Sequence, residues 1–139
     1  MTLTSGSRCK MNAMRYIVMF RSSIAFLLGV GSVFLMQALG ALAEEHAGTL
    51  KSPANIVNAI IPLAIYPLAG VAGCLLFPRH PLRAARRVTF GVFVGIILHI
   101  MLFPSFGGYE RNLFPFEIAI HTCWAAASCF LIAVLWKIK

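Results

Sequence analysis

Four long apolar runs, separated by short polar breaks, dominate the hydropathy pattern of this chain. They cover residues 22–43, 54–77, 88–106 and 113–136. The first run carries no charged residue, and a helix over its 22 residues is about 33 Å long, enough to cross a hydrocarbon layer of about 30 Å. Because the runs are long and continuous and do not alternate with polar positions, they predict membrane-spanning helices and not strands.

The composition agrees with lipid as the surrounding solvent. Of the 139 residues, 60% are hydrophobic and only 12% are charged, with a mean hydropathy of +0.85. A soluble domain is typically about 45–50% apolar and about 25% charged. We therefore expect an all-α integral membrane protein with four transmembrane helices, packed as an antiparallel up-down bundle because the connections are short.

The basic residues indicate how this bundle is oriented. With four spans, both termini and the middle loop share one side, and that side holds ten of the twelve Lys and Arg residues. The positive-inside rule then places both termini in the cytoplasm of a bacterial-type inner (plasma) membrane. The predicted parts are a basic cytoplasmic segment (1–21), the membrane domain (22–136) and a short cytoplasmic tail (137–139).

The net charge of +8 is explained by this orientation, so we expect no nucleic-acid partner. Within the middle loop, four arginines are also expected to contact anionic lipid head groups: Arg79, Arg83, Arg86 and Arg87.

Two interpretations of the first run remain open. Ala41 and Ala43 precede Glu44 with the small-residue spacing of a signal-peptidase site, after a basic amino-terminal region. The run is longer than the apolar core of about 7–15 residues that signal peptides usually have, which favours a helix that stays in the protein.

Small residues recur on one face of two spans. Gly91, Gly95 and His99 follow one another at intervals of four, the GxxxG spacing that lets helix backbones approach closely. Ala69 and Gly73 continue a similar stripe in the second span. We expect these glycines and Ala69 to form helix–helix contacts.

Polar side chains are expected to meet at one depth. Glu117 and His121 lie one helical turn apart, and span counting places His99 at the level of His121. Gln37 and Asn58 are expected at a similar depth, so the outer half of the bundle would contain one layer of five polar residues.

This layer has several interpretations. His99, Glu117 and His121 are residue types that bind a divalent metal such as zinc or iron, and they also suit a proton relay. His99 and His121 could alternatively hold a haem. The structural alternative is that the histidines and Glu117 only hydrogen-bond one another and fix the helix register.

Catalytic signatures are missing from the sequence. It contains no GxSxG, no HExxH, no phosphate-binding glycine loop and no CxxC pair. The sequence therefore favours a non-catalytic membrane protein that acts through helix–helix contacts with another membrane protein or with itself, as an accessory subunit, regulator or immunity-type protein. The alternatives are metal-ion or proton binding and transport, and a haem or quinone redox subunit.

Overall fold

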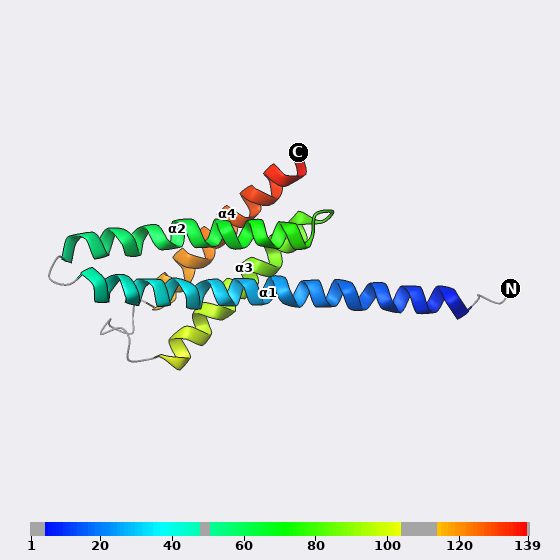
Figure 1. The fold of residues 1–139 in the computed structure, drawn as a ribbon, viewed down its shortest axis with the longest axis horizontal. Coiled ribbons are helices and arrows are strands. Elements are labelled where there is room, and N and C mark those ends of the chain that lie inside the picture. The colour runs from blue at the N-terminus through cyan, green and yellow to red at the C-terminus, as the bar shows by residue number, and fades with distance from the viewer. Residues whose placement is uncertain (1–4, 48–50, 104–113, 139) are drawn as a thin grey trace.

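The described part of the chain contains helices and short connections and no strand. The computed structural model describes residues 5–47, 51–103 and 114–138, and the side chains of residues 14–43, 45, 60–103 and 115–138. It contains four helices (Figure 1), which are α1 (Ser5–Ala47), α2 (Lys51–Leu76), α3 (Pro81–Leu102) and α4 (Phe114–Ile138). The prediction of an all-α protein with four helices is confirmed.

Three of these helices are long and apolar enough to cross a membrane. The qualifying segments are Met14–Ala43 in α1, Pro81–Leu102 in α3 and Pro115–Ile138 in α4. In α2 the apolar segment with described side chains, Ile60–Leu76, is shorter.

Three helices begin earlier than their apolar runs do, α2 by three residues and α1 and α3 by at least seven. α1 begins at Ser5 and not at residue 22, so the basic segment that precedes the first run is helical too. α3 begins at Pro81 and not at residue 88, which places Arg83, Arg86 and Arg87 on a helix and not in a loop. The physical reason is that charged residues end a membrane-buried segment without ending a helix, since Arg and Lys are good helix formers. Proline is also favourable at the first helical position.

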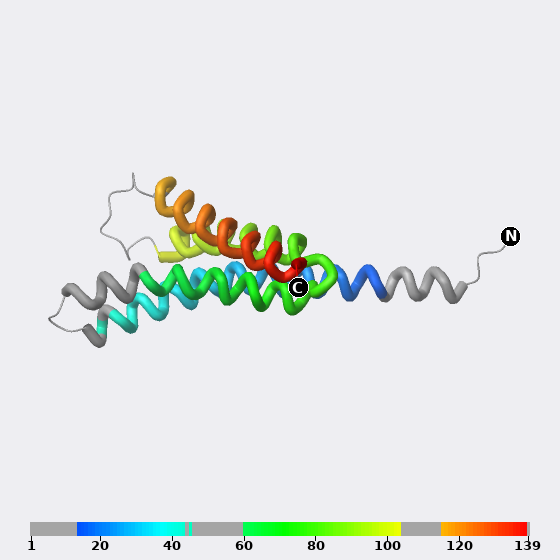
Figure 2. Tube along the Cα trace, turned by 90° about the horizontal axis from the view of Figure 1, so that it is seen from above, coloured from blue at the N-terminus to red at the C-terminus, as the bar shows by residue number. Residues whose placement is uncertain are grey.

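The helices form two layers (Figure 2). α1 and α2 lie in one layer and run in opposite directions, and α3 and α4 cover them at an angle. α1 packs against α2 and α3, and its contact with α3 is the most extensive in the molecule. α4 packs against α2 and α3, whereas the described residues of α1 and α4 do not meet. The main partner of α1 is therefore not the next helix in the chain.

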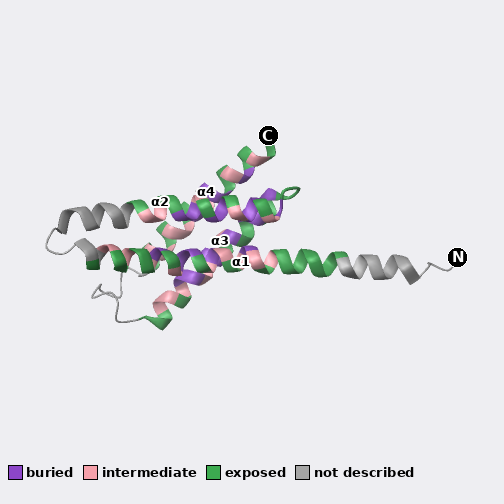
Figure 3. Ribbon diagram, viewed as in Figure 1, coloured by how far each residue is buried: buried purple, intermediate pink, exposed green. Residues whose placement is uncertain are grey.

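Buried positions line the space between the layers (Figure 3), and most of the large apolar side chains that the structure describes are exposed. The interior contains small and medium residues such as Ala84, Ala85, Val88 and Val92, all at most 1% exposed. Leucines on the outer faces, for example Leu68, are largely exposed. This distribution suits a protein whose outer faces contact lipid.

Glycines bring α1 and α3 together. A Cβ atom added at Gly91 would meet the Phe26 backbone oxygen and lie 3.0 Å from the Gly29 Cα of α1. A Cβ at Gly95 would lie 3.1 Å from the Val30 Cα. At Gly91 the two helices thus approach too closely for a Cβ atom, whereas at Gly95 a Cβ atom would be tight.

The small residues of α2 contact the other layer. A Cβ at Gly73 would lie 2.9 Å from the Val88 Cγ2 of α3, and Ala69 is 8% exposed within the core. All four residues expected at helix contacts are buried. The sequence pattern did not indicate Gly29, the partner of Gly91.

Candidate functional site

The most buried polar group in the described core is the side chain of Tyr66. It lies on α2 and is 0% exposed. Its hydroxyl is 3.1 Å from the Nδ1 of His121 on α4 and 3.5 Å from the Sδ of Met36 on α1. The rings of Tyr66 and His121 are edge to face, with centroids 6.0 Å apart. One hydroxyl therefore links three helices.

The proton of this hydroxyl has two arrangements. A tyrosine hydroxyl has one proton to donate, and a neutral histidine carries a proton on only one ring nitrogen. Tyr66 either donates to Nδ1 of His121 or accepts a bond from Nδ1–H and donates to the sulfur of Met36. A buried hydroxyl without a partner costs about 1–3 kcal/mol, so the pair fixes α2 against α4.

His99 has different neighbours. Its ring lies edge to face with Phe34 of α1, with centroids 6.0 Å apart, and 5.3 Å from the ring of Phe103. The structure thus places His99 against α1 and His121 against α2. Both imidazoles are half-buried.

Glu117 interacts through its negative charge with both histidines. Its side chain is half-buried in the first turn of α4, one turn before His121. Its carboxylate interacts electrostatically with Tyr66, His99 and His121. The cluster of Tyr66, His99, Glu117 and His121, which we call the polar cluster, is the candidate site of the protein.

The predicted polar layer is thus assembled only in part. Gln37 is half-buried, and the side chain of Asn58 lies outside the described residues. Across the side chains that the structure describes, no three His, Cys, Asp or Glu residues are close enough to hold a metal ion. A metal site at His99, Glu117 and His121 receives no support from this arrangement, and the haem alternative stays a prediction.

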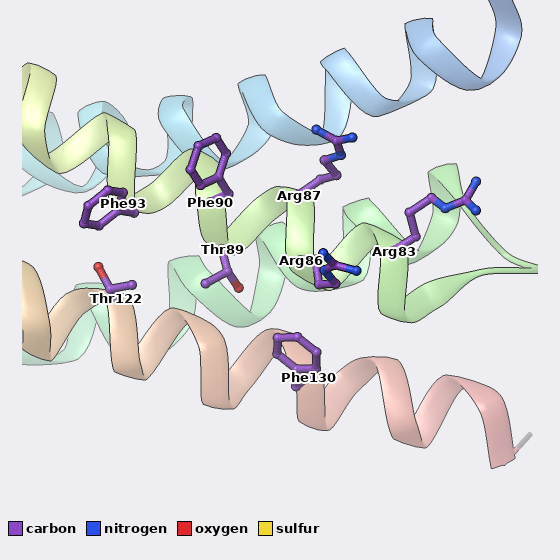
Figure 4. Close-up of a pocket in the computed structure, with 8 residues that line it drawn as sticks. All are labelled: Arg83, Arg86, Arg87, Thr89, Phe90, Phe93, Thr122 and Phe130. Carbon is purple, nitrogen blue, oxygen red and sulfur yellow. The ribbon is translucent and has the colours of Figure 1, made fainter. Parts of the chain in front are cut away.

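The four arginines expected at lipid head groups are all exposed. Arg83, Arg86 and Arg87 line a cavity of about 590 Å³ between α3 and α4 (Figure 4). Arg79 and Arg83 line a second cavity of about 320 Å³ that also touches Arg21 of α1. The basic residues therefore form a band at one end of the helices.

Sequence reasoning missed Tyr66 as the centre of the site. The available signal was a tyrosine in the middle of an apolar run, since tyrosines of membrane helices concentrate at the interfaces. It also missed Thr89 and Thr122, whose hydroxyl oxygens are buried without a hydrogen-bond partner. Threonine is common in apolar helices, so its position alone carried no signal.

Comparison with known proteins adds no relative. No family model, no curated protein and no solved structure matches this chain. What the fold and site define is a class, namely an all-helical protein with three candidate membrane spans and a polar cluster inside an apolar bundle.

Proposed function

We propose that this chain is a multi-pass protein of a bacterial-type inner membrane that acts without catalysis, through helix–helix contacts with another membrane protein or a second copy. An accessory subunit, a regulator or an immunity-type protein would work in this way. The observation that carries the proposal is the amino-terminal part of α1, which extends beyond the other helices and whose described side chains, residues 14–21, are all exposed (Figure 3).

This projecting segment is apolar as well as exposed. Tyr16 is 74% exposed, Phe20 is 68% exposed, and Met19 between them is 66% exposed. An exposed apolar helix face of this kind marks a contact with another protein or with a membrane. The apolar segment Met14–Ala43 has 30 residues and is about 45 Å long, about 15 Å more than a hydrocarbon core. Part of it is therefore available to a partner outside that core.

The membrane placement has its own support. Most of the large apolar side chains that the structure describes are exposed, and Gly91 and Gly95 lie close to the backbone of α1, which is consistent with helix packing in a membrane. In this proposal α2 is the fourth span, consecutive helices alternate in direction, and the positive-inside rule places both termini in the cytoplasm.

Reporter fusions test the topology. Green fluorescent protein fused after Lys139 is expected to fluoresce, and alkaline phosphatase at the same point to be inactive, because the carboxyl terminus is cytoplasmic. Fusions in the connection of residues 104–113 should give the opposite pair. Active phosphatase after Lys139 would contradict the orientation, and a protein released from membranes by alkaline carbonate would contradict insertion.

Photocrosslinking tests the contact itself. A photoreactive residue in place of Phe20 in native membranes should give one adduct of defined mass with a protein, either another copy or a single partner. The matched control is Leu131 on α4, which is 61% exposed and, in this proposal, faces lipid. If Phe20 and Leu131 both give only lipid adducts, the proposal of a protein contact at α1 fails.

The polar cluster favours a second candidate, proton binding or transport. Its specific support is the Tyr66–His121 hydrogen bond beside Glu117, since a histidine linked to a hydroxyl and near a carboxylate can pass protons. In liposomes with a pH-sensitive dye inside, His121→Ala should abolish proton flux. The control Ser128→Ala, whose hydroxyl bonds only to its own helix, should retain that flux. Flux that is absent in the wild type or unchanged in His121→Ala rules this candidate out.

A further inference from the structure

The larger cavity combines side chains of three kinds in a definite order along its length (Figure 4). Arginines lie at one end, Thr89 follows them, and Phe93 and Thr122 lie at the other end. Arg83 and Phe93 are ten residues apart on α3, so the cavity extends about 15 Å along the helix. A volume of about 590 Å³ is within the range of sites that hold a small molecule.

The charged end of the cavity suits an anion. Arg83, Arg86 and Arg87 line it, and no carboxylate is among the described residues that do so. Arg83 lies in the first turn of α3, where the helix dipole is positive and added cations are unfavourable, and Arg86 and Arg87 follow in the second turn and add to the positive charge. A bound anion would relieve this repulsion. Guanidinium groups hold phosphate through paired hydrogen bonds, which makes phosphate the anion of choice.

Thr89 supplies the next polar group along the cavity, beyond the arginines. Its oxygen is buried, no nitrogen or oxygen atom of the described residues bonds to it, and its interaction with the Cys129 thiol is weak. A threonine inside a helix ordinarily bonds to a carbonyl of the preceding turn, which Thr89 does not do. Thr89 lies three residues after Arg86, about 4.5 Å along the axis. A ligand with its phosphate at the arginines would therefore have its next polar group beside Thr89.

The remaining walls are aromatic. Phe93 of α3 and Phe130 of α4 line the cavity together with Phe90, whose ring lies 5.8 Å from that of Phe26 of α1. A free phosphate ion would use only the basic end and leave these walls without a partner. The lining of the cavity therefore suits an anion that carries a hydrocarbon chain.

We infer that the cavity binds one molecule of an anionic phospholipid. The phosphate lies between Arg83, Arg86 and Arg87, an ester oxygen accepts a hydrogen bond from Thr89, and one acyl chain lies along Phe93 and Phe130. The inference rests on the proposed membrane placement, and it assigns to these arginines a discrete lipid site in place of a general attraction to the membrane surface.

The test compares two pairs of charge-removing substitutions in the full-length protein. Wild type and variants are reconstituted in vesicles of phosphatidylcholine and phosphatidylglycerol, extracted in mild detergent, and weighed by native mass spectrometry. Arg86→Gln with Arg87→Gln should lower the fraction that retains phosphatidylglycerol about tenfold, which corresponds to the loss of charge-assisted hydrogen bonds. The control pair, Arg15→Gln with Lys137→Gln, removes the same charge at exposed positions outside both cavities and should retain the lipid.

Two hydroxyl-removing variants separate the site from general packing. Thr89→Val should lower retention about threefold because one hydrogen bond is lost within the membrane. Ser128→Ala removes a hydroxyl that lies outside the cavity and bonds only within α4, so it should leave retention unchanged. Inorganic phosphate added to the extracted protein should not displace the lipid, because it lacks the chain.

Several outcomes would overturn the inference. Equal losses in the two charge-removing pairs would mean general surface attraction, and displacement by inorganic phosphate would mean a simple anion site. Protection of the buried Cys74 and Cys129 thiols from labelling shows that each variant is folded. A wild type that resists carbonate extraction but retains no phosphatidylglycerol refutes this inference alone, whereas release by carbonate refutes the membrane proposal.

Discussion

The glycine contact between α1 and α3 makes the strongest prediction about stability. In Gly91→Ala the new methyl group meets three backbone atoms of α1: the Phe26 carbonyl oxygen, the Phe26 carbon at 3.1 Å and the Gly29 Cα at 3.0 Å. Backbone atoms cannot rotate away as a side chain does, so the helices must separate. We expect this overpacking to destabilise the protein by about 1–3 kcal/mol.

The matched control lies on α1. A Cβ at Gly31 has nothing within 4 Å, so Gly31→Ala adds the same methyl group in open space. Alanine is favoured over glycine in a helix by about 0.5–1 kcal/mol, so Gly31→Ala should be neutral or slightly stabilising. The two variants should therefore differ by about 1–4 kcal/mol.

The free energy of unfolding can be measured by circular dichroism while a denaturing detergent is titrated into mild-detergent micelles. Labelling of Cys74 and Cys129, both 0% exposed, reports separation of the helices independently. If Gly91→Ala is as stable as Gly31→Ala and protects both thiols equally, the close approach of α1 and α3 does not stabilise the fold.

Three further predictions concern the polar side chains, and the same titration checks each of them. Tyr66→Phe should destabilise the protein by about 0.6–1.7 kcal/mol because the hydrogen bond to His121 is lost. A double-mutant cycle with His121→Ala should show most of that energy as coupling between the two side chains. Additive effects would show that the two side chains do not interact. Ser128→Ala should change stability by less than about 0.5 kcal/mol, because the hydroxyl bonds at 2.7 Å to the Trp124 carbonyl of its own helix and links no two elements; a larger loss would point to a partner on another helix. Thr122→Val should be neutral or stabilising by up to about 1 kcal/mol, since it replaces a buried hydroxyl without a partner by a methyl group of the same shape; a clear loss of stability would mean that this hydroxyl is bonded.

The helices themselves were predictable because their cause is local. Each apolar run carries its own signal of length and hydropathy, and each one overlaps a helix of the structure over most of its length, although α3 ends at Leu102 and the third run was expected to reach residue 106. The ends were less predictable. The charges at Arg15 and Arg21 suggest where lipid contact stops, but α1 continues through both of them, because a helix does not need lipid to persist.

The pairing of the helices could not be read from the sequence. Consecutive helices were expected to be neighbours, yet α1 makes its most extensive contact with α3. Gly91 was recognisable as a packing residue by its spacing from Gly95, whereas the residue opposite it, Gly29, depends on how α3 crosses α1. Such pairing is a property of two segments distant in the chain, and no single segment encodes it.

In the candidate site, too, the features within one helix could be predicted, whereas the contacts between helices could not. Glu117 and His121 were predicted together because four residues make one helical turn. The bond between His121 and Tyr66 joins α4 to α2 across 55 residues, and the expected neighbour of His121 was His99. Depth along the membrane placed the two histidines at one level, but it said nothing about the direction in which each ring points.

The contact between α1 and α3 also has a consequence for how the protein is made. A chain leaves the ribosome in order, so in the proposed membrane placement α1 and α2 would enter the membrane while α3 is still being synthesised. During that interval the glycine face of α1 at Gly29 has no helix against it. When α3 emerges, its contact with α1 completes the interior, and the short connection of residues 77–80 holds it close by. A nascent chain halted after α2 would expose a surface that other proteins of the insertion machinery can recognise, and full protection of that surface would begin only once Gly91 has entered the bilayer.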